Sequence, residues 1–281
     1  MAYLKRTWIT GSVIEVEKYY TCKYKSKKVS RMPKVNSSSE QMQKVNERNA
    51  IKKLRRLVNS NFTENDMHLV LTYEYLKKPD TTEAAKKDIA KFLRNLKRAY
   101  SKKGHELKYI SVAEYSKKSV HFHLVITKGL NYDEISAVWG KGRIHVNPLD
   151  GSGDYSQLAE YLIKQSRKTF NDPERAIYKK RWSGSKNLIK PEPIIEIAKA
   201  DSWREVPTAP AGYIVMTDSI YTDVSDITGY PFQYYKCIAI DNKAQERMMK
   251  RYGKRQRNRK NNKSCCKYSS RSNNEKHKPK A

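Results

Sequence analysis

The order of strand-like and helix-like stretches between residues 67 and 170 limits the folds open to this chain. Four stretches have the apolar, β-branched pattern of strands, at 67–75, 106–116, 119–128 and 142–148. Helical patterns separate or follow them at 81–104, 131–138 and 154–170. Because only a short polar Ser-Lys-Lys joins the second strand to the third, those two are expected to form an antiparallel hairpin. The β-α-β-β-α-β-α order predicts an α+β fold of the ferredoxin-like split βαβ type, with an antiparallel sheet and helices on one face.

The flanking segments predict additions to this core. Residues 7–25 alternate well enough to form a hairpin, and Ser38 or Ser39 is placed to cap a helix that runs to about residue 60. Residues 212–240 have the pattern of two strands around a turn-rich centre. We therefore expect three regions: 1–66, a hairpin and helix packed on the core; 67–242, the core domain with a C-terminal strand extension; and 243–281, a disordered basic tail.

The charge of the chain points to a polyanionic partner. Lysine and arginine number 58 against 29 aspartates and glutamates, which gives a formal net charge of +29. Positive charge on this scale repels itself unless a polyanion neutralises it, so nucleic acid is the default partner. No long apolar run or basic amphipathic anchor is evident, which argues against a membrane partner. The sequence also lacks the GxxxxGK[ST] motif of nucleotide-driven motors.

The cysteines indicate a reducing compartment. The chain has four, Cys22, Cys237, Cys265 and Cys266, and no CxxC pair. This spacing argues against a zinc ribbon and against a disulfide framework. Together with the lack of a signal-peptide pattern, it favours the cytoplasm.

Two histidines, His121 and His123, stand one position apart in the strand-like stretch 119–128. Side chains of a strand alternate between faces, so both imidazoles point one way, while Val120, Phe122 and neighbouring apolar residues point toward a core. If the hairpin pairs as expected, Glu114 lies opposite His121 on the same face.

Two histidines and one carboxylate can hold a divalent ion and leave positions open for substrate. The simpler alternatives assign no metal to these residues. The two histidines would be ordinary surface residues with hydrogen-bond partners, and Glu114 would form an ion pair with Lys117 or Lys118. Two other HxH chemistries do not fit, because Val125 stands where a histidine triad requires a third histidine and no second H-x-[ST] repeat exists. The chemistry that remains compatible with the motif is a metal-assisted attack on a phosphodiester by another side chain.

The candidate nucleophile lies in the helical stretch 154–170. Tyr161 and Lys164 are three residues apart and share a helix face that Lys168 extends. A phenol ionises near pH 10, so it becomes useful when a metal polarises the phosphate and a lysine offsets the developing charge. With 20 tyrosines in the chain, a packed Tyr161 is the simpler alternative. Tyr155, the rival in this helix, points elsewhere, since six residues rotate it by about 240°.

These motifs resemble those of the HUH endonucleases, and among them the rolling-circle replication initiators of plasmids and phages. The matching pieces are "LVLTYEY" (69–75), "HFHLV" (121–125) and "YLIK" (161–164). The tyrosine follows the histidines, as in replication proteins, whereas conjugative relaxases have the reverse order. Residues 46–62 and 181–193 are similar to filamentous-phage gene II-like replication proteins. One departure is that the helical stretch 154–170 has a single Y-x-x-K in place of the paired tyrosines of some phage initiators.

The resemblance implies an HUH nuclease fold that nicks and rejoins one DNA strand at a replication origin through a 5′-phosphotyrosine and a free 3′-hydroxyl. It implies Mg²⁺ or Mn²⁺ on His121 and His123, for which Glu114 is our predicted third ligand. Tyr161 would attack phosphorus and Lys164 would stabilise charge. Origin DNA, a host helicase and a DNA polymerase would be the partners, in the cytoplasm of a bacterial host. The predicted phosphate contacts are Lys52, Lys53, Arg55, Arg56, Lys168, Lys254, Arg255 and Arg257.

Two other classes stay open at this point. One is a tyrosine transposase of the HUH class, which is usually a shorter chain without the long N-terminal segment. The other is a nucleic-acid-binding regulator that uses the sheet without cleavage. A binding platform of that kind requires exposed aromatic residues on the sheet, whereas the predicted face offers histidine, glutamate and valine.

Overall fold

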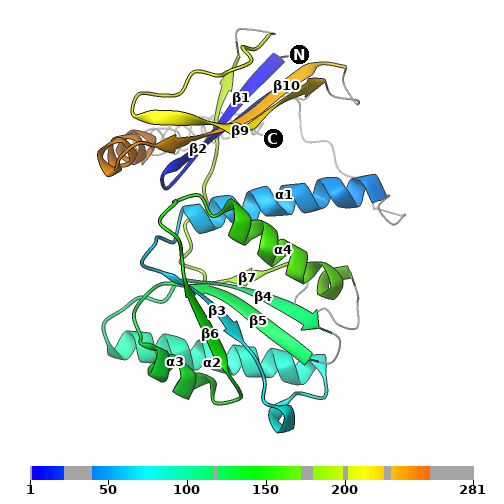
Figure 1. The fold of residues 1–281 in the computed structure, drawn as a ribbon, viewed down its shortest axis with the longest axis vertical. Helices are drawn as coiled ribbons and strands as arrows, with labels where there is room; N and C mark the ends of the chain where they lie inside the picture. The colour runs from blue at the N-terminus through cyan, green and yellow to red at the C-terminus, as the bar shows by residue number, and fades with distance from the viewer. Residues whose placement is uncertain are drawn as a thin grey trace, which may run out of the picture. The chain divides into compact units, whose positions relative to one another are not determined.

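The computed structural model describes residues 2–21, 40–116, 119–171, 180–198, 202–224 and 229–253. The chain divides into two compact units (Figure 1). One comprises residues 23–192, here called the nuclease-like unit after the fold that the sequence predicts. The other joins residues 1–22 to residues 193–281 and is called the terminal unit.

The nuclease-like unit contains a five-stranded antiparallel sheet in the order β6-β3-β5-β4-β7. Its strands are β3 (Met67–Leu71), β4 (Tyr109–Ser116), β5 (Ser119–Ile126), β6 (Ile144–Pro148) and the two-residue β7 (Ser183–Gly184). Because β3 and β4 both run antiparallel to β5, which lies between them, they are parallel to each other. The helix that joins them completes a split βαβ unit, so the predicted α+β, ferredoxin-like class is confirmed.

Two helices of this pattern cover one face of the sheet. Helix α2 (Thr82–Lys102) begins at Thr81, whose hydroxyl accepts a hydrogen bond from the Ala84 amide at 3.1 Å. Helix α3 (Tyr132–Trp139) begins with a capping box and ends at Gly140, which is left-handed. Their apolar stripes pack on Phe122, Leu124 and the other apolar residues of that face. The predicted core face of β5 is confirmed.

The opposite face of the sheet is covered as well, which corrects the expectation of helices on one face only. Helix α1 (Glu40–Asn59) contributes Leu54 and Val58, and α4 (Ser156–Asn171) contributes Leu162 and Ile163. These side chains form a second core with apolar residues of β4 and β5. Both helices were predicted from the sequence, but they lie outside the split βαβ pattern itself, so that pattern did not place them on this face.

The first motif strand is shorter than the predicted 67–75. Strand β3 ends at Leu71, and a 3₁₀ turn, η1 (Tyr75–Lys77), follows. Beyond the strand, the Thr72 amide and hydroxyl both donate to the Arg143 carbonyl, at 3.0 and 2.9 Å. The Trp139 indole donates to the Thr72 carbonyl at 2.8 Å. The chain is therefore held by side chains and single backbone bonds there instead of a regular ladder.

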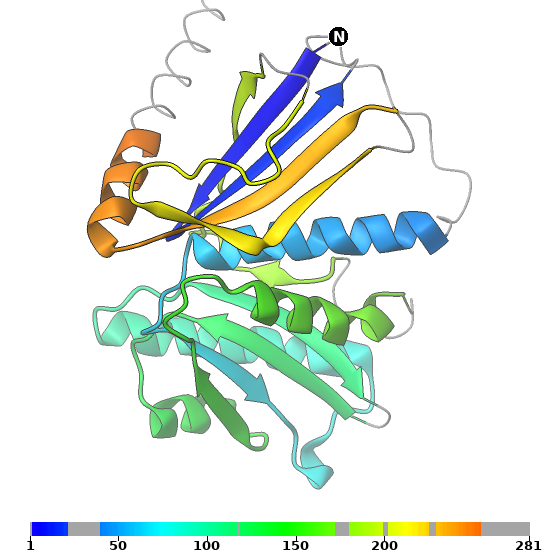
Figure 2. The same cartoon turned by 45° about the horizontal axis from the view of Figure 1, so that its top comes forward.

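The terminal unit is a second antiparallel sheet, in the order β8-β1-β2-β10-β9. The predicted hairpin is present as β1 (Ala2–Thr10) and β2 (Val13–Thr21), turning at Gly11 with φ 60°. In the same sheet (Figure 2), β8 (Ile194–Ile197) pairs with β1, β10 (Pro231–Ala239) pairs with β2, and β9 (Tyr213–Val224) pairs with β10. The hairpin thus pairs with strands about 200 residues away or more, so the predicted boundaries at 66 and 242 do not match the two units.

The described part of the predicted tail differs from the expectation of disorder. Residues 242–253 are helical, and this C-terminal helix, orange in Figure 2, packs Ala244, Met248 and Tyr252 against the sheet core. These residues are four apart, so they form one apolar stripe that anchors the helix. The rest of the predicted tail, 254–281, lies outside the described residues. No helix in the described part of the chain is long and apolar enough to cross a membrane.

Candidate functional site

The predicted pairing of the histidine strand is confirmed. In the ladder between β4 and β5, Glu114 lies opposite His121 and Val112 lies opposite His123. Residues directly opposite in an antiparallel pair share a face, so the carboxylate and both imidazoles project from the same side of the sheet. This is the side that α1 and α4 partly cover, whereas Phe122 between the histidines points into the other core.

His123 is buried and makes contacts through both ring nitrogens. Its Nε2 lies 2.9 Å from the Glu114 Oε2, and its Nδ1 lies 3.3 Å from the Nε2 of His68. The imidazole is only 2% exposed, whereas about a quarter of the Glu114 side chain reaches solvent. The carboxylate therefore stands between the buried histidine and the open end of the site.

His68 is a site residue that the sequence reasoning missed. It lies on β3 opposite Val125, which gives it the same face as His123. Burial lowers the pKa of His68 to about 4, with a smaller contribution from His123, so the ring is neutral at physiological pH. A neutral imidazole has one donor and one acceptor nitrogen and can therefore exchange a hydrogen bond with His123 in either direction.

A fourth histidine, His145, joins the same face from β6. Val70 of β3 lies opposite His123 on one side and opposite His145 on the other. His145 is exposed at this edge of the sheet. Four of the chain's six histidines thus share one sheet face. In the sequence, His68 and His145 each occupy a position in a strand-like run that faces away from the apolar core residues beside it.

His121 is half-buried beside this cluster. Burial lowers its pKa, the Glu114 carboxylate opposes that effect, and the nearby His123, Lys78 and His145 add to the lowering. A lowered pKa keeps the imidazole neutral, and the neutral form is the one that coordinates metal ions.

Tyr161 stands over the buried histidines. Its ring centroid lies 5.4 Å from that of His123 and 6.1 Å from that of His68, and both contacts are edge-on. Leu162 and Ile163 anchor α4 in the core, and this leaves Tyr161 41% exposed at the rim of the site. The structure therefore brings the predicted nucleophile to the predicted ligand His123.

Tyr155 occupies a different environment. It is 3% exposed within the core under α4, and burial raises its pKa to about 12, with smaller contributions from Asp150, Asp66 and Glu64. Its backbone amide donates to Asn59 Oδ1 at 3.1 Å. The predicted separation of the two tyrosines is confirmed, since Tyr161 contacts the histidines and Tyr155 packs in the core.

The remaining predicted residues are dispersed. Lys164 is exposed one turn after Tyr161, and on α1 the side chains of Lys52, Lys53 and Arg56 reach solvent to different degrees. Arg55 is an exception, because at 6% exposure its guanidinium is buried beside Leu54. A buried guanidinium does not face a DNA backbone, which corrects its inclusion among the phosphate contacts. The structure does not describe the side chain of Lys168. The following residues lie wholly outside the described part of the chain: Lys117, Lys118, Lys254, Arg255 and Arg257.

Within the described residues, no three His, Cys, Asp or Glu side chains converge as a preformed metal centre. The types of donor atom on this face nevertheless suit a metal site. Glu114 and His123 are in hydrogen-bond contact and His121 faces the same side, which is the two-imidazole, one-carboxylate set that binds divalent ions with open positions.

The fold and this face define a class: a split βαβ domain in which the sheet face partly covered by α1 and α4 gathers histidines, a carboxylate and a partly exposed tyrosine. Residues 66–169, which contain β3 through nearly all of α4, match the family model for the replication-associated proteins of the ORF2 and gene II protein type. The match is to replication-associated proteins, the type of protein that the motifs predicted, and it is confined to this segment. The searches of curated proteins and of solved structures found no match.

Proposed function

We propose that this protein nicks and rejoins one strand of DNA at a replication origin and so initiates rolling-circle replication of a plasmid or phage. One observation carries the proposal: the Tyr161 ring lies 5.4 Å from that of His123, whose Nε2 is 2.9 Å from Glu114. The proposed nucleophile thus lies beside one proposed ligand, and that ligand contacts a second, within the segment that matches replication-associated proteins.

In the proposed reaction, the Tyr161 phenol oxygen attacks the scissile phosphorus. A phosphorus–oxygen bond forms to tyrosine as the bond to the 3′-oxygen breaks, which leaves a 5′-phosphotyrosine and a free 3′-hydroxyl. The phenol proton is released and the leaving oxygen gains one, so no proton or electron is left over. The later attack of a 3′-hydroxyl on the phosphotyrosine reverses these changes and rejoins the strand. Lys164, one turn along α4, stabilises the negative charge that develops at the phosphate.

Glu114, His121 and His123 are proposed to hold Mg²⁺ or Mn²⁺. Such an ion polarises the phosphate and supplies charge stabilisation when it is bound. The lowered pKa of His121 keeps its ring in the form that ligates. Glu114 is the adaptable member, because its side chain is partly exposed while His123 is fixed in the sheet.

DNA is proposed to be held mainly through its phosphates. Lys52, Lys53 and Arg56 of α1 belong to the nuclease-like unit, and the basic residues after 253 are further candidates. Each contact to single-stranded DNA adds about −0.7 to the slope of log affinity against log salt. In a bacterial cytoplasm, a DNA polymerase would extend the free 3′-hydroxyl while a host helicase separates the strands.

The test is a search for a covalent adduct. Single-stranded oligonucleotides tiled across the DNA around the gene are incubated with the full chain and Mg²⁺ or Mn²⁺, and the products are separated under denaturing conditions. A protein–DNA species that the Tyr161→Phe variant lacks is the expected result. Cleavage that yields only free 5′-phosphate ends would contradict the tyrosine mechanism, because it points to water as the nucleophile.

A further inference from the structure

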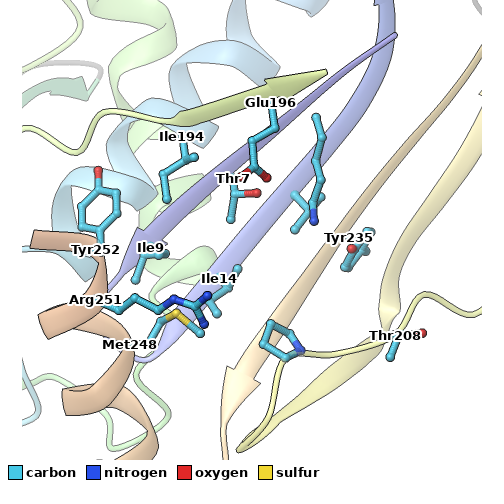
Figure 3. Close-up of a pocket in the computed structure, with 13 residues that line it drawn as sticks. Thr7, Ile9, Ile14, Ile194, Glu196, Thr208, Tyr235, Met248, Arg251 and Tyr252 are labelled. Atoms are coloured by element: carbon cyan, nitrogen blue, oxygen red, sulfur yellow. The ribbon is translucent and has the colours of Figure 1, made fainter. Parts of the chain in front are cut away.

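The terminal unit contains a pocket that plays no part in the proposed nicking chemistry. It lies on one face of the sheet, between the strands, the C-terminal helix over 242–253 and the segment 208–210 (Figure 3). Its residues come from separate places in the chain, so the fold, and no local motif, creates it.

The floor of the pocket is apolar. Ile9 and Ile14 lie opposite each other on β1 and β2, and Ile194 of β8 and Tyr235 of β10 join the same face through the ladders. Met248 and Tyr252 of the C-terminal helix close one side. Two tyrosine rings beside a floor of branched aliphatic side chains form a surface suited to a flat, partly apolar group.

The size of the pocket limits what it accepts. Its volume is about 220 Å³, below the roughly 300–1,000 Å³ typical of sites for drug-sized ligands. A group as large as one nucleobase with part of its sugar suits this volume, whereas a whole dinucleotide cofactor does not.

Two cations and one carboxylate supply the charge in the pocket lining. Lys5 and Arg251 line it, and Figure 3 shows the Arg251 side chain extending from the helix across the sheet. Glu196 lies opposite Lys5 in the ladder between β1 and β8 and supplies one hydrogen-bond acceptor, and Thr7 supplies a hydroxyl. Two cations beside an apolar floor, only partly offset by Glu196, match a ligand with an anionic group on one side and a base on the other.

Further features of the same sheet face extend this chemistry beyond the pocket. Lys18 lies opposite Lys5, and burial together with the Lys5 charge lowers its pKa. The Lys18 ammonium sits 4.9 Å from the Trp203 ring centroid. Farther along the ladder, Tyr3 lies opposite Tyr20, and both belong to a cluster of aromatic rings.

That cluster is completed by two further rings. Trp203 stands edge-on to Tyr3 at 5.4 Å, and Tyr230, which is partly exposed, stacks on Tyr20 at 3.8 Å. Lysines interleaved with aromatic rings are the pattern by which proteins follow a single strand of nucleic acid, with bases on the rings and phosphates at the cations.

We propose that the terminal unit is an accessory single-stranded DNA-binding module, in which the pocket receives one nucleotide of the strand. The base rests on the Ile9–Ile14 floor beside Tyr235 and Tyr252, and the adjoining phosphate faces Lys5 and Arg251. This function is separate from the nicking site and does not depend on cleavage. The strand is favoured over a free nucleotide because the aromatic and lysine surface continues past the pocket.

The test compares two charge reversals on one helix. Arg251 lines the pocket, whereas the neighbouring Lys250 is exposed and does not, so Arg251→Glu and Lys250→Glu make the same charge change in different places. Both are placed in the full chain with Tyr161→Phe, so that no adduct forms. Fluorescence anisotropy measures binding of single-stranded oligonucleotides of about 12 nucleotides, within the usual range for such modules. Arg251→Glu is expected to weaken binding on the order of tenfold, against about twofold for Lys250→Glu, which acts only through overall charge.

A crosslinking arm locates the base. An oligonucleotide that contains iododeoxyuridine is photocrosslinked, and adducts at Tyr235 or Tyr252 are expected. Equal losses of affinity in the two variants, or crosslinks confined to the nuclease-like unit, would overturn the proposal. Free thymidine monophosphate and unlabelled oligonucleotide are compared as competitors of the Tyr252 crosslink. If thymidine monophosphate blocks the crosslink as fully as the oligonucleotide does, the ligand is a free nucleotide and the proposal is overturned. Because nicking does not enter these measurements, their failure is distinct from failure of the tyrosine mechanism.

Discussion

The Nδ1 of His123 lies 3.3 Å from the Nε2 of His68, while its other nitrogen lies 2.9 Å from a Glu114 oxygen. A neutral imidazole carries one N–H, so these two contacts are coupled. If Nε2–H donates to Glu114, then Nδ1 accepts a hydrogen bond from His68. If a cation binds at Nε2, the proton belongs on Nδ1 and His68 becomes the acceptor. His68 can serve both arrangements, because its own neutral ring accepts or donates at Nε2.

His68→Leu should therefore weaken metal binding without removing a ligand. The partner of a ligating histidine typically contributes 10–100-fold to metal affinity, and a loss of about that size is expected for Mn²⁺ measured by calorimetry. His68→Gln, which keeps a donor and an acceptor, should recover much of it. Circular dichroism of both variants checks the fold. Equal affinities for wild type and His68→Leu would show that the contact does not orient His123.

The three proposed ligands should be needed for cleavage and far less for DNA binding. His121→Ala and His123→Ala should each abolish nicking, as should a chelator, while affinity for single-stranded DNA falls little because phosphate contacts are spread over the protein. Glu114→Gln should have a milder effect, since its amide oxygen can still coordinate. Nicking and anisotropy assays on the same preparations test this. A wild-type nicking rate in either histidine variant would exclude that residue as a ligand.

Local patterns were enough to predict the centre of the site. The alternation around Phe122 set the face of both histidines, and the short connection after Ser116 set Glu114 opposite His121. The spacing of Tyr161 from Tyr155 correctly separated an exposed phenol from a buried one. Each of these inferences depended on residues that are close in the sequence.

Two site histidines and the place of the N-terminal hairpin were not predicted, because they depend on strand pairing between distant parts of the sequence. His68 and His145 reach the site because β3 and β6 pair at a distance, and no local pattern names their neighbours. The N-terminal hairpin likewise pairs with β10, more than 200 residues later, which moved it out of the predicted first region. The C-terminal helix did carry a local signal, since Ala244, Met248 and Tyr252 repeat every fourth residue, but the surrounding lysines and arginines obscured it.

Gly142 should prove essential for stability near the first motif strand. A Cβ at this position would lie 2.3 Å from the Thr72 carbonyl oxygen and 2.7 Å from the Glu74 amide nitrogen, and neither backbone atom can move freely. Gly142→Ala is expected to lower the free energy of unfolding by about 2 kcal/mol, the usual scale of overpacking. Gly151→Ala is the control, because its nearest contact is an ordinary 3.6 Å to the Glu64 side chain. Urea denaturation compares the two, and equal midpoints would contradict the prediction.

Alkaline pH should destabilise the folded chain. Burial raises the pKa values of Tyr155, Tyr213 and Tyr235 to about 12 from the ordinary 10.0. Between these values the unfolded chain has released protons that the folded chain retains, so the free energy of unfolding falls as pH rises from about 10 to 12. Tyr213→Phe should reduce this fall, and it should also stabilise the protein at neutral pH by about 1 kcal/mol, because the Tyr213 hydroxyl is buried without a hydrogen-bond partner among the described residues. Urea midpoints across this pH range would contradict the prediction if they did not change.

The choice between the two tyrosines of α4 decides the mechanism. Tyr161 is 41% exposed and lies beside His123 and His68, whereas Tyr155 is 3% exposed in the core, where a phenolate would be strongly disfavoured. Tyr161→Phe should fold, bind DNA and metal, and form no covalent adduct, since it lacks only the attacking oxygen. Tyr155→Phe should keep most of the activity, because its hydroxyl makes only a long 3.4 Å hydrogen bond to the Asp150 carbonyl. Peptide mapping of the wild-type adduct by mass spectrometry should place the DNA on Tyr161. DNA found on Tyr155 would instead require α4 to unpack during catalysis, and would overturn the assignment made from this geometry.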